Sequence, residues 1–137
     1  MCVFIRIAPM ISLYPLFTTI HYWISRIGLL TAVIMFALGI FIGLIRHGDV
    51  TRWYRRAVYT VAGVMVAQSL LGLTMYFIGG RPYEDVHLIY GLGAVLALPF
   101  FIFVEVTAKK RPSMGSYMWG FAVLAGILVR SIMTGHV

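Results

Sequence analysis

The chain has a single cysteine, Cys2, among its 137 residues, and only four acidic side chains. One cysteine excludes an internal disulfide, a Cys-x-x-Cys redox pair, a Cys-x-x-Cys-His attachment site and a cage of thiolate ligands around a metal. Any protein ligand to a metal is therefore a nitrogen or oxygen atom. Charged residues make up 11% of the chain, whereas soluble domains average about 25%. This shortage of charge excludes a water-soluble globule.

Long apolar runs take the place of charge, since 61% of the residues are hydrophobic. Four of these runs reach the roughly 20 residues that a membrane-spanning helix needs. They lie near 22–45, 57–78, 86–108 and 116–134. Because the connecting loops are short, neighbouring helices must run antiparallel. The sequence therefore predicts an all-α, integral membrane, four-helix up-and-down bundle built from two repeated hairpins.

The bundle is expected to occupy residues 21–137. Residues 1–20 are apolar but contain Arg6, Pro9 and Pro15, which disfavour a continuous spanning helix. This segment is predicted to be interfacial or extended. No small-residue cleavage site follows a basic start, so no signal peptide is expected, and Met10 is an alternative start.

The net charge of +7 results from eleven Lys and Arg residues and four Asp and Glu residues. Those of the first and third loops are Arg46, Arg52, Arg55, Arg56, Lys109, Lys110 and Arg111. The positive-inside rule places these two loops in the cytoplasm and both termini outside, in the inner (cytoplasmic) membrane of a prokaryote. Basic residues at headgroup depth indicate contact with membrane lipid and no nucleic-acid partner.

Two histidines are the main candidates for a binding site. His21 opens the first predicted helix and His87 opens the third, and these two helices are diagonal in an up-and-down bundle. Both histidines precede stripes of small residues at helical spacing, namely Ser25, Gly28, Gly91 and Ala94. Small residues leave room for a flat macrocycle, and two neutral imidazoles are the axial pair of a low-spin haem b. The same pattern also suits close helix packing with interfacial histidines.

Three arginines near the same end are candidates for binding carboxylates at the edge of a macrocycle. They are Arg26, Arg81 and Arg130. The alternative is that each arginine extends toward the lipid headgroups. If the chain repeats one hairpin, Gln68 in the second helix corresponds to Arg130 in the fourth.

Two further polar residues lie within the apolar runs. Gln68 is expected to form a hydrogen bond with a neighbouring helix. Glu105 is predicted to form a structural ion pair with Arg46, Lys109 or His47; unpaired, it would be a group able to take up a proton.

The sequence around several of these residues resembles that of heme A synthase, whose halves are four-helix modules with haem-ligating histidines. The similar positions are Arg55-Arg56-Ala57 through Gln68-Ser69-Leu70-Leu71-Gly72-Leu73-Thr74, then Gly80-Arg81-Pro82, His87-Leu88 and Gly91. The resemblance covers roughly residues 20–105 and implies haem ligation by His21 and His87.

The chain also departs from that family. Heme A synthases resemble two such modules in one chain, and this chain has one. Thr18 and Tyr22 stand where the catalytic module of the family has a glutamate before its histidine and an arginine after it. No outer-loop cysteine pair is present. The resemblance therefore implies haem binding without implying oxidation of a haem methyl group.

These observations predict a membrane b-type cytochrome with one bis-histidine haem b near the outer side. It would be an electron-transfer subunit working with other membrane subunits or as a homodimer. A second hypothesis is a non-catalytic accessory subunit of a respiratory or photosynthetic complex that binds a chlorophyll-type pigment, a lipid or no cofactor. A third is a heme A synthase-like enzyme that acts as a dimer.

Overall fold

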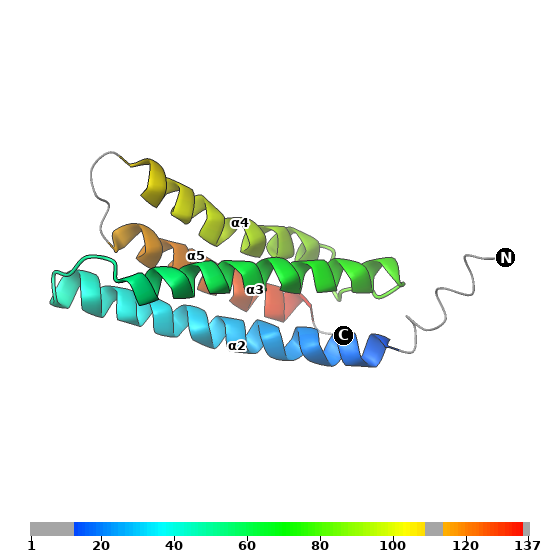
Figure 1. Cartoon of the computed structure of the whole chain (residues 1–137). Coiled ribbons are helices and arrows are strands. Elements are labelled where there is room, and N and C mark those ends of the chain that lie inside the picture. The colour runs from blue at the N-terminus through cyan, green and yellow to red at the C-terminus, as the bar shows by residue number, and fades with distance from the viewer. Residues whose placement is uncertain (1–12, 109–113, 136–137) are drawn as a thin grey trace.

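The computed structural model describes residues 13–108 and 114–135, and within them the chain forms four long helices and no strand. They are α2 (Tyr14–Ile40), which continues into the π-helical turn η1 (Phe41–Ile45), α3 (Arg52–Phe77), α4 (Val86–Thr107) and α5 (Gly115–Thr134). Successive helices run in opposite directions (Figure 1). The predicted all-α four-helix up-and-down fold is therefore confirmed.

The four helices form a ring in which α2 and α4 are diagonal. Helix α5 packs extensively against both α4 and α2, whereas α3 makes smaller contacts with α2 and α4. Helices α2 and α4 both begin at one end of the bundle, where α3 and α5 finish (Figure 1). We call this end, which contains His21 and His87, the histidine end. The opposite end, which contains Glu105, is the glutamate end.

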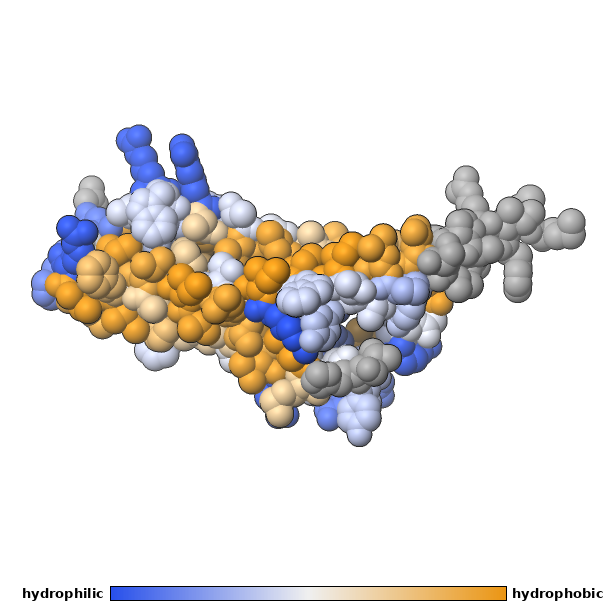
Figure 2. All heavy atoms as spheres, turned by 90° about the horizontal axis from the view of Figure 1, so that it is seen from below, coloured by the Kyte–Doolittle hydropathy of each residue, from blue (hydrophilic) through white to orange (hydrophobic). Residues whose placement is uncertain are grey.

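All four helices are long and apolar enough to cross a membrane. Large apolar side chains point away from the bundle, and those of Phe77, Ile89 and Trp119 are each at least 67% exposed. Hydrophobic residues cover much of the length of the molecule, and many hydrophilic residues gather toward its ends (Figure 2). Such an outer surface is stable against hydrocarbon and unfavourable in water.

The first helix starts eight residues before the predicted position, because it begins at Tyr14 instead of residue 22. Pro15 does not prevent this, since it occupies the first turn, where a missing N–H removes no helical hydrogen bond. The prediction that residues 14–20 lie outside the helix is thus corrected. Residues 1–12, with Arg6 and Pro9, lie outside the described residues.

The start of the second predicted helix also differs from the prediction. Helix α3 begins at Arg52 instead of residue 57, with Thr51 as its N-cap residue. The Thr51 hydroxyl accepts a hydrogen bond from the backbone N–H of Tyr54 at 3.4 Å, which satisfies one of the free donors of the first turn. Three of the basic residues assigned to the first loop, Arg52, Arg55 and Arg56, therefore lie on α3, whereas Arg46 remains in the connection between the helices.

A glycine turn ends α3 at the histidine end. Gly79 adopts the left-handed conformation, with φ of 105°, which glycine enters without steric cost. Its N–H donates to the carbonyl of Tyr76, and the N–H of Gly80 donates to that of Met75. This pair of bonds is the Schellman arrangement that commonly closes helices. It brings the connection back toward α4.

The core at the glutamate end contains two fully buried tyrosines, Tyr54 and Tyr117. Their ring centroids are 6.2 Å apart. The Tyr54 hydroxyl donates to the backbone oxygen of Met35 in α2 at 2.7 Å. Because Tyr54 belongs to α3 and Tyr117 to α5, this contact links three of the four helices.

Glu105 completes the polar contacts at this end. Its carboxylate pairs with Arg55 at 2.8 Å and accepts a hydrogen bond from the Tyr117 hydroxyl at 3.0 Å. The expected structural ion pair is confirmed with Arg55 in place of the predicted Arg46 or His47, and the third predicted partner, Lys109, lies outside the described residues. Arg55 is the partner because the early start of α3 places it on a helix facing α4 instead of in a loop.

Candidate functional site

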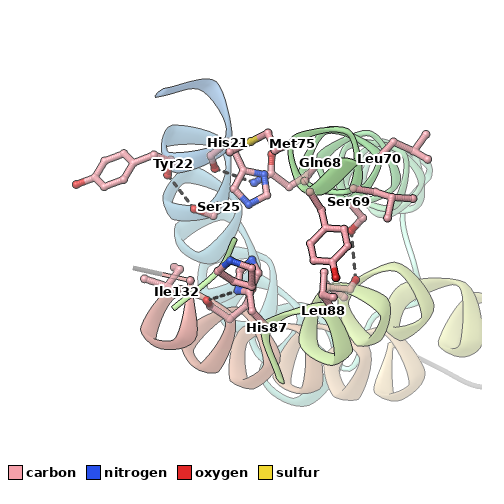
Figure 3. Close-up of a pocket in the computed structure, with 18 of the residues that line it drawn as sticks. His21, Tyr22, Ser25, Gln68, Ser69, Leu70, Met75, His87, Leu88 and Ile132 are labelled. Carbon is pink, nitrogen blue, oxygen red and sulfur yellow. Dashed lines mark hydrogen bonds between the residues drawn. The ribbon is translucent and has the colours of Figure 1, made fainter. Parts of the chain in front are cut away.

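The two histidines converge at the histidine end. His21 lies two turns inside α2, and His87 is the second residue of α4. Their ring centroids are 6.2 Å apart, with an angle of 67° between the ring planes. The rings extend toward each other from opposite sides of a cavity (Figure 3). The expectation that the imidazoles face each other across the core is met, although only His87 opens its helix.

His87 is oriented by the last turn of α5. Its Nδ1 lies 3.0 Å from the backbone oxygen of Ser131. Because a carbonyl oxygen only accepts hydrogen bonds, Nδ1 of His87 is the donor, and in the neutral ring the lone pair is then on Nε2. A ring nitrogen fixed in this way is the usual support of a metal-ligating histidine.

His21 is supported through its backbone instead of its ring. The Gln68 side-chain amide of α3 donates to the His21 carbonyl oxygen at 2.7 Å, which confirms the predicted bond from Gln68 to a neighbouring helix. The Nδ1 atom of His21 and the Oε1 atom of Gln68 are both buried, and neither has a hydrogen-bond partner within the described part of the chain. Two buried polar atoms beside the cavity are thus left unsatisfied.

The histidines line a cavity of about 550 Å³. This volume is typical of a pocket for a small organic ligand, since such pockets span about 300–1,000 Å³. Helices α2, α3 and α4 contribute most of the lining, and the last turn of α5 closes one side. The surface is hollowed at this end, between bluer hydrophilic side chains (Figure 2).

The predicted small residues separate into two groups. Ser25, Gly91 and Ala94 line the cavity. A Cβ atom added at Gly91 would meet nothing within 4 Å, so this glycine borders open space. Gly28 does not line the cavity. Its added Cβ would lie 2.9 Å from Cε of Met65, so Gly28 allows close packing of α2 against α3, and its assignment to the ligand site is corrected.

Of the three predicted arginines, two line the cavity and one does not. Arg26 and Arg81 line the cavity, and each guanidinium stacks on a tyrosine ring, that of Tyr22 at 3.4 Å and that of Tyr76 at 4.3 Å. Arg130 lies outside the cavity because its position on α5 directs it toward Tyr90 at the surface, with 3.5 Å between Nε and the hydroxyl oxygen. Its predicted place among the ligand-binding residues is therefore corrected.

Two glycines that the sequence analysis did not single out as site residues lie against the histidine rings. A Cβ atom at Gly72 would lie 3.0 Å from Cε1 of His21, and one at Gly135 would lie 2.5 Å from Cε1 of His87. Gly72 follows Gln68 by four residues, and Gly135 follows Ser131 by four. The spacing of apolar residues in the sequence does not mark either glycine as a contact of a histidine ring.

Gly72→Ala is expected to push the His21 ring from its position, because the added methyl group comes within 3.0 Å of it. The flexible ring can move by a few tenths of an ångström, so we expect a severalfold weaker affinity for the ligand of the cavity and an intact fold. Gly63→Ala on the same helix is the matched control, since its Cβ meets nothing within 4 Å. Equal ligand content in the two purified variants would contradict this role of Gly72.

Comparison with known proteins returned no matching family model, no similar curated protein and no similar solved structure.

Proposed function

We propose that the chain is a membrane b-type cytochrome in which His21 and His87 bind one haem from opposite faces. The observation that carries this proposal is the 6.2 Å separation of the ring centroids. Metal–imidazole bonds are about 2 Å long, and a ring centre lies about 1 Å behind its nitrogen. Two imidazoles on opposite sides of one metal are therefore expected to have centroids about 6 Å apart.

The number of protein ligands supports a macrocycle over a bare metal ion. Among the described residues, no group of three or more His, Cys, Asp or Glu side chains could hold a metal. Two imidazoles leave most of a coordination sphere unfilled, and a porphyrin supplies the four remaining nitrogens. The predicted ligand set therefore fits haem better than zinc or another ion held by the protein alone.

The charge of the lining supports an anionic ligand. Arg26 and Arg81 face the cavity, and neither forms an ion pair with a carboxylate of the described residues. Arg26 lies within the apolar helix α2, where an arginine inside a membrane is costly unless it is paired, and Arg81 lies in the exposed loop after α3. The carboxylates at the edge of a haem b are suitable partners, because guanidinium groups bind carboxylates with paired hydrogen bonds.

Electron transfer is the function that these residues support best. When bound, the haem iron supplies the change of redox state, and the protein supplies ligands and position. The described lining contains no aspartate or glutamate, so it offers no carboxylate for acid–base catalysis. Thr18 and Tyr22, which replace the charged residues of the heme A synthase motif, point to the same choice. The resemblance to that family extends to the predicted haem ligands only.

The positive-inside rule orients the proposed cytochrome with the histidine end outside and the glutamate end in the cytoplasm. Its partners in electron transfer would then be other membrane subunits or a second copy of the chain. The exposed apolar surface of the four helices would contact lipid or these subunits.

The proposal is tested by expressing the full chain in a membrane, purifying it in mild detergent and recording its reduced-minus-oxidised optical spectrum. We expect the spectrum of a six-coordinate, low-spin haem b. Organic extraction then identifies the pigment. Protohaem in the extract supports the proposal, whereas a magnesium chlorin supports the pigment-binding accessory subunit. Absence of any pigment contradicts the proposal and supports only a four-helix scaffold.

A further inference from the structure

The two histidines of the site are held unequally. The ring of His87 is fixed at Nδ1 by the Ser131 carbonyl and contacts Gly135 so closely that no Cβ atom fits there. It also lies between α4 and α5, the pair of helices with the most extensive contact. The orientation of His87 is therefore set by three independent features.

The ring of His21 has weaker support. Its Nδ1 is buried without a hydrogen-bond partner in the described ranges, and the bond from Gln68 reaches only its backbone. Helices α2 and α3, which flank it, have the smaller contact of the hairpin pairs. Loss of the outer hydrogen bond to a metal-bound histidine typically weakens metal binding by about 10–100-fold. His21 is accordingly the weaker of the two predicted ligands.

The cavity that His21 lines extends toward the start of α2. Its lining continues past His21 to Tyr14, Thr18 and Gly80 near the start of α2. The buried Oε1 of Gln68, which has no partner in the described part of the chain, lines the same space and can accept a hydrogen bond from the displaced imidazole. The His87 ring lies closer to its glycine than the His21 ring does, since an added Cβ atom would be 2.5 Å from Cε1 of His87 at Gly135 and 3.0 Å from Cε1 of His21 at Gly72.

Building on the haem site proposed above, we propose that His87 is the permanent ligand and His21 is exchangeable. A neutral diatomic gas, of which carbon monoxide is the probe, then takes the place of His21 on that face. In this exchange the bond between His21 Nε2 and the metal breaks and a bond to the gas forms. No electron or proton is transferred. The function that follows is binding of a small gas at an otherwise six-coordinate site.

The first test adds carbon monoxide to the reduced, purified protein and follows the optical spectrum. We expect the low-spin spectrum to convert to that of a carbonyl complex, at a rate limited by departure of His21 and therefore independent of gas concentration at saturation. A haem spectrum that does not change under saturating gas overturns the inference and leaves the cytochrome proposal standing. Absence of haem overturns both.

The second test compares His21→Ala with His87→Ala, with His47→Asn as the control. His47 lies in the first loop with φ of 48°, a conformation that asparagine tolerates. We expect His21→Ala to keep more of its haem than His87→Ala, to bind carbon monoxide faster than the wild type and to regain a six-coordinate spectrum with added imidazole. His87→Ala should lose haem by about tenfold or more.

The opposite order of haem loss, or equal loss in both variants, overturns the assignment of the exchangeable ligand. Because imidazole rescue is read from the spectrum, it separates a missing ligand from a misfolded chain.

Discussion

Gly135→Ala is expected to reduce the content of the proposed haem by about tenfold or more. The added Cβ would lie 2.5 Å from Cε1 and 2.8 Å from Nδ1 of His87. Both distances are shorter than the contacts that Cβ atoms make in proteins. The ring must then move away from the Ser131 carbonyl, so the bond that orients His87 is lost. The quantity to measure is bound haem per purified protein.

The end of α5 has little freedom to relieve this clash. The carbonyl of Thr134, the preceding residue, accepts a hydrogen bond from the backbone N–H of Glu84 at 3.1 Å, and the Thr134 side chain is buried. Gly126→Ala on the same helix is the control, because its Cβ meets nothing within 4 Å. Haem content that is equal in Gly135→Ala and Gly126→Ala would show that Gly135 does not position His87.

Glu105→Ala is expected to lower the free energy of unfolding by about 2 kcal/mol while leaving the histidine end intact. Interhelical hydrogen bonds in membranes average about 0.6 kcal/mol, but a buried donor left without a partner costs about 1–3 kcal/mol. Tyr117 becomes such a donor, since it is fully buried and its hydroxyl bonds to Glu105. Unfolding of the detergent-solubilised protein by a denaturing detergent measures the change.

Two further variants isolate the cause of that loss. Tyr117→Phe removes the donor itself, so the double variant Glu105→Ala/Tyr117→Phe should be more stable than Glu105→Ala alone. Asp85→Ala, at an exposed acid that makes no side-chain capping bond to its helix, should have little effect. A double variant that is less stable than Glu105→Ala would contradict the explanation.

The fold was predictable because a membrane span requires a long apolar segment, and four such segments with short connections allow few arrangements. The start of α2 was not predictable, because a proline breaks a helix when it lies in the interior but is tolerated in the first turn, and the sequence does not show which position Pro15 occupies. An error in the start of α3 likewise led to the wrong prediction for the partner of Glu105. Arg55 lies on α3 only because Thr51 caps that helix earlier than the apolar run suggests.

The candidate site was predictable in its two histidines and only partly in their surroundings. His21 and His87 could be placed at similar depth from helix direction alone. Arg130 could not be placed correctly, because the rotation of α5 about its own axis decides whether that residue faces the cavity or Tyr90. Gly72 and Gly135 depend on that same rotation and on how closely two helices approach, which the spacing of apolar residues does not define.

Electron paramagnetic resonance of the oxidised, purified chain tests most directly whether both imidazoles bind one iron. We expect a low-spin ferric signal for the wild type and a high-spin signal for His21→Ala, in which one axial position has lost its nitrogen. Addition of imidazole should restore the low-spin signal. A low-spin signal that is identical in the wild type, His21→Ala and His87→Ala would show that the metal is held elsewhere.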